Sequence, residues 1–276
     1  MPNFDISPYV HMVPAELRRL IRTGQVKHIP TAGMCAGYAQ ANLVILPRAY
    51  AGDFREYARL NPAPCPLLEV LDGDPRTRDM AADGNILTDI PEYFIYKNGQ
   101  LAQRCADATP FWEEGMVGFL IGCSFSFEEA LMGAGIEVRH IAMGRNVPMY
   151  RTSVMTRPVG PFSGPTVCSM RPMTPADAQK ASAITAAMPN VHGAPLHIGD
   201  PEKIGVHDLM HPDYGEPVDI YPGEVPVFWP CGVTPQAAIE NARPPLVITH
   251  SPGHMFVTDI LNSELNDYLE RRKGQA

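Results

Sequence analysis

The stretch GFLIGCSFSFEEAL, residues 118–131, changes its periodicity halfway along and predicts an extended segment that runs into a helix. In its first half, Cys123 falls with the phenylalanines on one side of an extended chain, and Ser124 and Ser126 fall on the other. From Glu128 onward the residues indicate a helix that ends at a glycine, with acidic residues in its favourable first turn. Unpaired backbone N–H groups gather at such a helix N-terminus, so we expect an oxyanion site here.

The composition is typical of a compact globular protein and excludes two classes of partner. The chain has 276 residues, of which 45% are hydrophobic and 19% charged, enough to bury one large core or two modest ones. Its net charge of −8, without a basic stripe, offers no cationic face to nucleic acid. It lacks an apolar run of roughly 20 residues and a signal-like N-terminus, so we expect no membrane span and a cytoplasmic location.

The cysteines are scattered, without a C-x-x-C pair or a regular framework. In a reducing compartment we expect them to be small buried hydrophobic residues. Cys123 lies near a helix N-terminus, which lowers a thiol pKa, but it comes several residues too early to cap the helix. The six positions are Cys35, Cys65, Cys105, Cys123, Cys168 and Cys231.

Helix-like and strand-like segments alternate along the rest of the chain, punctuated by proline and glycine. Thr174 and Thr234 are expected to cap two of the helices, and Asn98-Gly99 suits the turn of a hairpin. Helices are expected at 14–24, on both sides of Pro47 within 38–62, from Phe111, at 128–135, 174–188, 234–242 and 263–272. Strands are expected at 65–72, in a hairpin over 91–105, and at 137–141, 149–156, 166–173, 193–199, 225–232, 245–252 and 254–260.

This alternation favours an α/β fold, with a mixed, largely parallel sheet flanked by helices and a smaller inserted α+β domain. We assign residues 1–115 and 190–276 to the discontinuous main domain and residues 116–189 to the smaller one. The site is then expected at the interface between the two.

The segment NVHGAPLHIGDPEKIGVHDLMHPD, residues 190–213, is rich in histidine. His192, His197 and Asp200 supply the groups of an acid/base pair or of a divalent metal site, and a turn histidine bonded to backbone is the alternative. Glycine and proline between the two histidines exclude a helical metal pair. His207 and His211 have a four-residue spacing, but the nearby prolines favour an exposed loop.

Two more turns follow predicted strands. The segment ITHSPGHMFVTD, residues 248–259, places His250 and His254 at the carboxyl end of an apolar strand. Ligands gather at such ends in open α/β sheets, so both histidines are candidates for a ligand or metal site, with a capping role as the alternative. Thr234 begins a helix whose N-terminus is a second candidate anion site, and an ordinary N-cap is the alternative.

Arg171 ends a predicted strand, and its planar guanidinium suits bidentate binding of a substrate carboxylate. A surface charge is the more common role of an arginine. We find no G-x-S-x-G elbow, Walker loop or dinucleotide fingerprint, which disfavours nucleotide cofactors. No cofactor is required by these patterns, and a divalent metal stays an alternative.

Eight motifs occur in the order found in a family of hydro-lyases, a family that resembles the D-glutamate cyclase domain of mitochondria. The likeness extends from about His28 to Asp259. MCAGY departs from the family pattern, which has a proline before Gly37. The eight motifs are TAGMCAGYAQANLVILP, CPLLEVLDGDP, GFLIGCSFSFEEAL, NVPMYRT, GPTVCSMRPM, HGAPLHIGDP, PVFWPCGVTPQ and THSPGHMFVTD.

The resemblance implies a two-domain α/β fold and a reaction, the closure of D-glutamate to 5-oxo-D-proline with loss of water. That reaction requires a base, an acid, donors for a tetrahedral oxyanion and a cation for the second carboxylate. We assign one group of residues to each role. The oxyanion donors are Ser124, Ser126 and the amides near Phe127; the acid and base are among His192, His197 and Glu128; the cation is Arg171. Substrate contacts are also expected from Cys123, Thr234, His250 and Asp200, and the alternative metal ligands are His192, His197, Asp200, His250 and His254.

Three rival functions use the same residues. The first is hydration or dehydration of another small carboxylic acid, the second is a binding protein without turnover, and the third is a metal-dependent hydrolase. We expect a small carboxylic acid as partner and a homodimer as the assembly.

Overall fold

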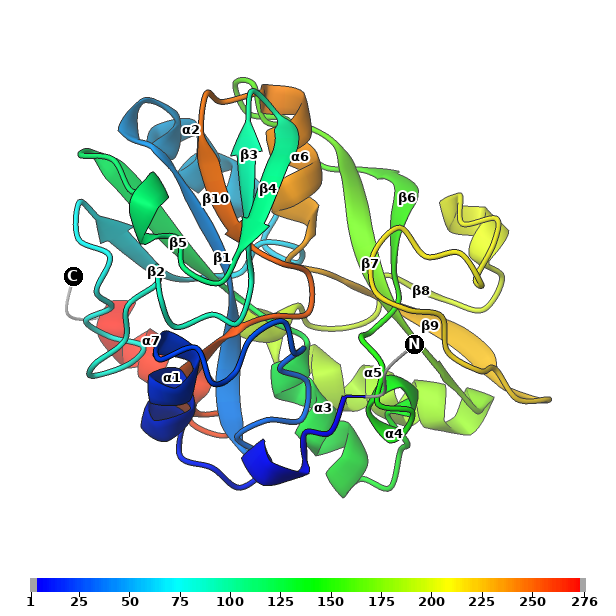
Figure 1. Ribbon diagram of the computed structural model, residues 1–276. Helices are drawn as coiled ribbons and strands as arrows, with labels where there is room; N and C mark the ends of the chain where they lie inside the picture. The colour runs from blue at the N-terminus through cyan, green and yellow to red at the C-terminus, as the bar shows by residue number, and fades with distance from the viewer. Residues whose placement is uncertain (1–3, 274–276) are drawn as a thin grey trace.

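Two β-sheets covered by helices make up the fold (Figure 1). The computed structural model describes residues 4–273. In this part of the chain the larger sheet contains β1 (Tyr38–Pro47), β2 (Leu67–Asp72), β3 (Tyr93–Lys97), β4 (Gln100–Cys105), β5 (Met116–Gly122), β10 (Val247–His250) and β11 (Phe256–Leu261). The smaller sheet contains β6 (Met149–Met155), β7 (Pro165–Met173), β8 (His197–Ile198) and β9 (Val225–Pro230). The α-helices are α1 (Pro14–Arg22), α2 (Arg48–Leu60), α3 (Phe125–Gly133), α4 (Arg139–Ala142), α5 (Pro175–Ala186), α6 (Thr234–Ala242) and α7 (Leu265–Lys273).

The prediction of a largely parallel sheet is wrong, because every pairing between the described strands is antiparallel. The larger sheet has the order β2-β5-β1-β10-β3-β4, with β11 also paired to β1. β1 and β2 do run in the same direction and are joined by α2, as alternation predicts, but β5 lies between them and pairs antiparallel with both. β9 and β10 are joined by α6 and belong to different sheets. Alternation of strand and helix therefore did not reveal which strands become neighbours.

β1 is the central strand of the larger sheet, and the helix predicted before Pro47 is wrong. A short apolar run rich in alanine and leucine fits a buried helix as well as a strand. Here both faces of the strand are buried: Leu43 and Ile45 pack into one hydrophobic cluster, and Val44 and Leu46 pack into another. The second helix of the prediction is confirmed, since α2 begins directly after Pro47.

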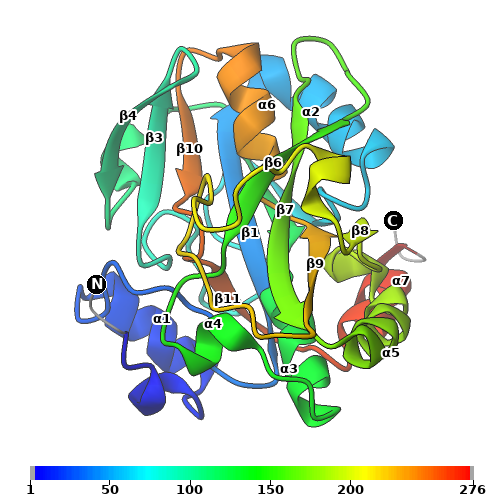
Figure 2. The ribbon, with the colours of Figure 1, turned by 90° about the vertical axis from the view of Figure 1, so that its right-hand side faces the viewer.

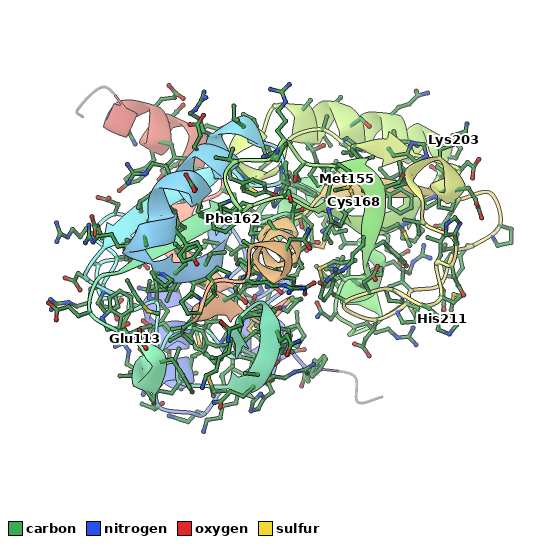
Figure 3. The ribbon with its side chains drawn as sticks, turned by 90° about the horizontal axis from the view of Figure 1, so that it is seen from above. Glu113, Met155, Phe162, Cys168, Lys203 and His211 are labelled. Carbon is green, nitrogen blue, oxygen red and sulfur yellow. The ribbon has the colours of Figure 1, made fainter. Side chains whose placement is uncertain are left out.

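The smaller sheet has the order β6-β7-β9-β8 and two different faces (Figure 2). Side chains two residues apart on a strand share a face. Trp229 of β9 joins the large core of the molecule, whereas Cys168 of β7 and Phe228 of β9 join a separate cluster on the outer face. Figure 3 shows Cys168 on its strand and His211 in the segment at the outer edge of this sheet.

Several local predictions are confirmed. α1 begins at Pro14, and the Oγ1 of Thr174 caps α5 by accepting from the backbone N–H of Asp177. The β3–β4 hairpin turns at Asn98 and Gly99, which both have positive φ, as a type I′ turn requires.

Other local predictions are wrong. Residues 139–142 form α4 rather than a strand, and Phe111 ends a 3₁₀ turn instead of starting an α-helix. In the stretch 118–131, β5 ends at Gly122 and α3 begins at Phe125, three residues earlier than predicted.

The predicted domain boundaries stay a prediction, as does the homodimer. Among the described residues no helix is both long enough and apolar enough to cross a bilayer.

Candidate functional site

Two turns that each pair a glycine with a cysteine approach one another where the sheets meet. Gly122-Cys123 joins β5 to α3, and Cys231-Gly232 joins β9 to α6. Asn42 of β1 lies between them, because its Nδ2 donates to the Gly122 carbonyl at 2.7 Å and a Cβ on Gly232 would lie 2.0 Å from the same nitrogen. The N-terminal ends of α3 and α6 are therefore brought to one region, where the backbone N–H groups of Ser126 and Thr234 donate to the carbonyls of Cys123 and Cys231.

Arg171 of β7 is the buried cation of this region. Its side chain is closed to solvent and lies between the rings of Phe127 and Trp229, whose centroids are 5.0 and 5.5 Å from the guanidinium carbon. Nη1 donates to Ser169 Oγ at 3.0 Å, and Nη2 donates to Ser124 Oγ at 3.1 Å. The aromatic rings exclude water while the two hydroxyls fix the plane of the guanidinium.

Glu128 is the counter-ion of Arg171 and is equally buried. Its Oε1 accepts from Nε of Arg171 at 3.0 Å and also from Nη2, so four of the five N–H groups of Arg171 are bonded to protein atoms. Burial opposes the ionisation of Glu128, but the nearby His140 and Arg171 outweigh it and hold the pKa of the carboxyl below its usual value. Arg171 was predicted to bind a substrate carboxylate with two N–H groups, and one N–H group remains available for that role.

Buried polar atoms without a hydrogen-bond partner lie around this ion pair. Glu128 Oε2 is one of them, and His140 Nε2 is another, lying 3.2 Å from Glu128 Oε1 without hydrogen-bond geometry. An unpaired buried acceptor costs roughly 1–3 kcal/mol, so such atoms mark places that a ligand or water satisfies.

His192 reaches the same region from the loop after α5. It has a left-handed backbone, with φ of 85°, and its Nδ1 lies 2.7 Å from the carbonyl oxygen of Ala63. Because a carbonyl only accepts, Nδ1 carries the proton in the neutral ring, which leaves Nε2 as a bare acceptor that is buried and unpaired. Burial lowers the pKa of His192 to about 4, and the charge of Arg171 acts in the same direction. We refer to Arg171, Glu128, Ser124, Ser169 and His192 as the Arg171 centre.

Acid is expected to unfold the protein through its buried histidines. Burial lowers the pKa of both His192 and His250 from 6.5 to about 4, so the unfolded chain binds protons that the folded chain does not. Their contribution is full above about pH 6.5 and is lost as the pH falls toward 4, by about 2 kcal/mol per histidine at pH 5. Urea unfolding at pH 7 and pH 5 measures this loss. The variant His192→Asn should show a shallower pH dependence and His211→Asn, in an exposed loop, the wild-type one; identical slopes in all three would contradict the account.

Gly122 is required because the loop that carries His192 presses on it. A Cβ at Gly122 would lie 1.9 Å from the carbonyl oxygen of Asn190, so Gly122→Ala forces the backbone apart. We expect a loss of roughly 1–3 kcal/mol in the free energy of unfolding. Gly133→Ala in α3 is the control, because its Cβ meets nothing within 4 Å, and it should match the wild type or exceed it slightly. Equal denaturant midpoints for both variants would show that the loop does not rest on Gly122.

Other predicted residues line the neighbouring turns and carry structural bonds. Ser126 Oγ accepts from the backbone N–H of Gln40 at 2.9 Å. Thr234 occupies the first turn of α6, with Val233 as the N-cap, and its Oγ1 accepts from the N–H of Val167 at 3.0 Å. Burial raises the pKa of the Cys123 thiol well above its usual value, which does not favour a thiolate nucleophile.

The remaining histidine and aspartate candidates are not brought to the Arg171 centre. His197 packs against Phe228 on the outer face of the smaller sheet, and its Nε2 lies 2.7 Å from the carbonyl oxygen of Asp200. His250 ends β10 with Nδ1 3.1 Å from the Leu43 amide nitrogen, and His254 lines a separate groove. Their roles in substrate binding or catalysis stay predictions.

The metal prediction likewise stays open. Across residues 4–273 no three side chains of His, Cys, Asp or Glu gather in a way that would hold a metal ion.

Sequence reasoning missed Asn42, His140 and Ser169. The signal for Asn42 is a polar residue within the apolar run ANLVIL, and the signal for Ser169 is its place two residues before Arg171 on the same strand face. His140 had no such signal, because it lies on a short helix that we predicted as a strand.

Comparisons with known proteins agree on one family. The family model described as D-glutamate cyclase matches residues 117–259, which include every member of the Arg171 centre. A protein of Stutzerimonas stutzeri is 54% identical over 262 residues, 95% of this chain and 98% of its own length. A protein of Methylobacterium radiotolerans is 52% identical over 96% of this chain and 97% of its own length, and one of Bacillus licheniformis is 53% identical over 92% and 97%. All three are named "putative hydro-lyase".

Proposed function

The chain belongs to the D-glutamate cyclase family, and we propose that it is a hydro-lyase that closes D-glutamate to 5-oxo-D-proline at the Arg171 centre. One observation carries the proposal. The ion pair of Arg171 and Glu128 is closed to solvent, and the unpaired atoms Glu128 Oε2 and His192 Nε2 belong to the same centre, beside the N-terminus of α3.

The chemistry of cyclisation matches this set of groups. The amine nitrogen attacks the side-chain carboxyl carbon, a C–N bond forms, and one C–O bond breaks to release water. Two protons leave the ammonium nitrogen and two reach the departing oxygen, so the site must accept protons and return them. The tetrahedral intermediate carries negative charge, which donors in a dry site stabilise most strongly.

We assign the first proton transfer to His192. Its bare Nε2 is an acceptor in the neutral ring. With a pKa of about 4, the His192 ring by itself is a weak base. The carboxylates of a bound substrate bring negative charge that favours the protonated ring, so binding raises the pKa toward the working pH.

The other roles fall to residues around Arg171. Glu128 Oε2 is the second proton acceptor. Glu128 and the protonated His192 each pass one proton to the leaving oxygen, which departs as water. Ser124 Oγ accepts from Arg171, which leaves its own O–H free to donate to the oxyanion. Arg171 fixes the ionised state and position of Glu128, and its remaining N–H group binds the second carboxylate. The proposal invokes no cofactor.

Substrate must displace part of the protein to enter, because the side chains of the centre are buried. We assign this movement to residues 189–193, which carry His192 and rest on Gly122. Such loop opening commonly takes microseconds to milliseconds and limits many turnover rates.

The proposal is tested by incubating the protein with D-glutamate and, separately, with L-glutamate, 5-oxoproline and a panel of hydroxy acids. Mass spectrometry should show D-glutamate losing the mass of one water, faster than in a buffer control. If a hydroxy acid loses water and D-glutamate does not, the protein catalyses a different dehydratase reaction. Tight binding of D-glutamate without any product would instead indicate a binding protein.

A further inference from the structure

A groove of about 750 Å³ lies apart from the Arg171 centre, between the β3–β4 hairpin and the loop 213–216. Its volume is in the range of small-molecule sites. Its floor includes His254, Asn146, Glu92 and Ser251, and its walls include Phe94 and Arg104.

The floor of the groove presents hydrogen-bond acceptors. His254 Nδ1 lies 3.2 Å from the Pro252 carbonyl and therefore carries the proton of the neutral ring, which leaves Nε2 bare. Asn146 Nδ2 donates to the same carbonyl at 2.9 Å, which leaves its Oδ1 bare. Both bare atoms are buried without a partner, on residues that are only 7% and 9% exposed. Two unsatisfied acceptors on residues that line one groove mark a place where a donor from outside the chain would be stabilised.

Glu92 adds negative charge to this floor. Its oxygens accept from His28 Nδ1 at 2.6 Å and from Ser251 Oγ at 2.7 Å. Burial opposes its ionisation, but these two hydrogen bonds outweigh it and hold the pKa of Glu92 below its usual value. A group with several N–H donors and a positive charge, such as an ammonium, satisfies all three acceptors at once.

The wall of the groove presents a cation. The guanidinium of Arg104 lies over the Phe94 ring, 4.8 Å from its centroid, and within residues 4–273 it has no acidic partner in ion-pair distance. By contrast, Arg151 on the opposite side is bonded to Glu240 and Tyr214. Arg104 is therefore free to bind an anion, and its planar fork suits a carboxylate.

None of the residues of the Arg171 centre lines the groove, and one hydrophobic cluster contains sequence neighbours of both. The cluster contains Cys123 and Phe125, which flank Ser124 at the start of α3. It also contains Val147 and Met255, which follow the groove residues Asn146 and His254 in the sequence. The groove and the Arg171 centre are therefore two distinct places in the fold.

We propose that the groove binds an amino carboxylate, with its ammonium on His254, Asn146 and Glu92 and its carboxylate on Arg104. This second site is not part of the proposed reaction, because the class of its ligand is inferred from the side chains that line the groove. An amino acid that binds in this groove comes directly from the bulk solution and stays outside the Arg171 centre, which is closed to solvent.

Isothermal titration of the full chain tests this proposal with four probes. D- and L-glutamate carry both groups, glutarate lacks the amine, and butylamine lacks the carboxylate. We expect at least one glutamate enantiomer to bind roughly 10-fold or more tightly than either partial probe. Arg104→Gln, on the exposed wall, should weaken glutamate binding by roughly 10-fold and leave butylamine binding unchanged. His254→Leu should weaken glutamate and butylamine alike.

Arg59→Gln is the matched control, because Arg59 is an exposed arginine on α2 whose partner is Glu56. It should bind glutamate as the wild type does. An unchanged dissociation constant in Arg104→Gln, glutarate bound as tightly as glutamate, or no binding of either enantiomer up to about 10 mM would overturn the proposal. Turnover of D-glutamate by the same variants reports on the Arg171 centre separately, so either proposal can fail alone.

Discussion

Glu128→Gln is expected to lower the free energy of unfolding by about 3 kcal/mol and to abolish turnover, because it leaves Arg171 buried without a counter-ion. Glu128 and Arg171 are 1% and 0% exposed, and Arg171 donates two hydrogen bonds to Glu128 Oε1. Urea denaturation at neutral pH measures the stability, and product formation from D-glutamate measures the turnover. Glu56→Gln, in an exposed pair with Arg59, is the control and should leave both unchanged.

A double variant separates the stability effect from the chemical one. Glu128→Leu combined with Arg171→Met removes both charges together, and apolar replacement of a buried ion pair is often neutral or stabilising. We expect this variant to unfold near the wild-type denaturant concentration and to be inactive. A double variant as unstable as Glu128→Gln would show that the ion pair itself, rather than an unpaired charge, holds the sheets together.

His192→Asn is expected to reduce the turnover number by roughly 10²- to 10⁴-fold, the range for loss of an acid/base group. Asparagine tolerates the left-handed backbone found at this position, so the folded protein should persist. Circular dichroism checks the fold, and initial rates over a range of D-glutamate concentrations separate the turnover number from KM.

His197→Asn decides between two histidines that the sequence left open. His197 lies on the outer face of the smaller sheet, with its Nε2 near the Asp200 carbonyl, so we expect close to wild-type turnover from this variant. If His197→Asn loses activity and His192→Asn keeps it, the assignment of the base is wrong.

Local signals predicted many elements of this fold because they depend on neighbouring residues alone. Pro14 starts α1, Thr174 caps α5 and Asn98-Gly99 turns the β3–β4 hairpin, as their backbone preferences require. Sheet topology depends on contacts between distant residues, and no local signal indicated that β5 would lie between β1 and β2. The same limit explains β1, whose strand conformation follows from burial on both faces by segments far away in the sequence.

The candidate site was predicted in part for a similar reason. Ser124, Glu128, Arg171 and His192 came from residue chemistry and from the family resemblance. The structure bonds Ser124 and Glu128 to Arg171, and it places His192 where the charge of Arg171 lowers the pKa of its ring. The partner that holds Arg171 could not be predicted, because the pair is 43 residues apart and joins β7 to α3. His254 was predicted as a ligand candidate, but only the fold places it in a groove with Asn146 and Glu92.

The central claim is that water is removed from D-glutamate at the Arg171 centre. The most direct test measures formation of 5-oxo-D-proline from D-glutamate by the wild type and by the folded double variant Glu128→Leu with Arg171→Met, with a buffer control for spontaneous closure. We predict product from the wild type and none above the buffer rate from the double variant. Product at the wild-type rate from the folded double variant would contradict the account.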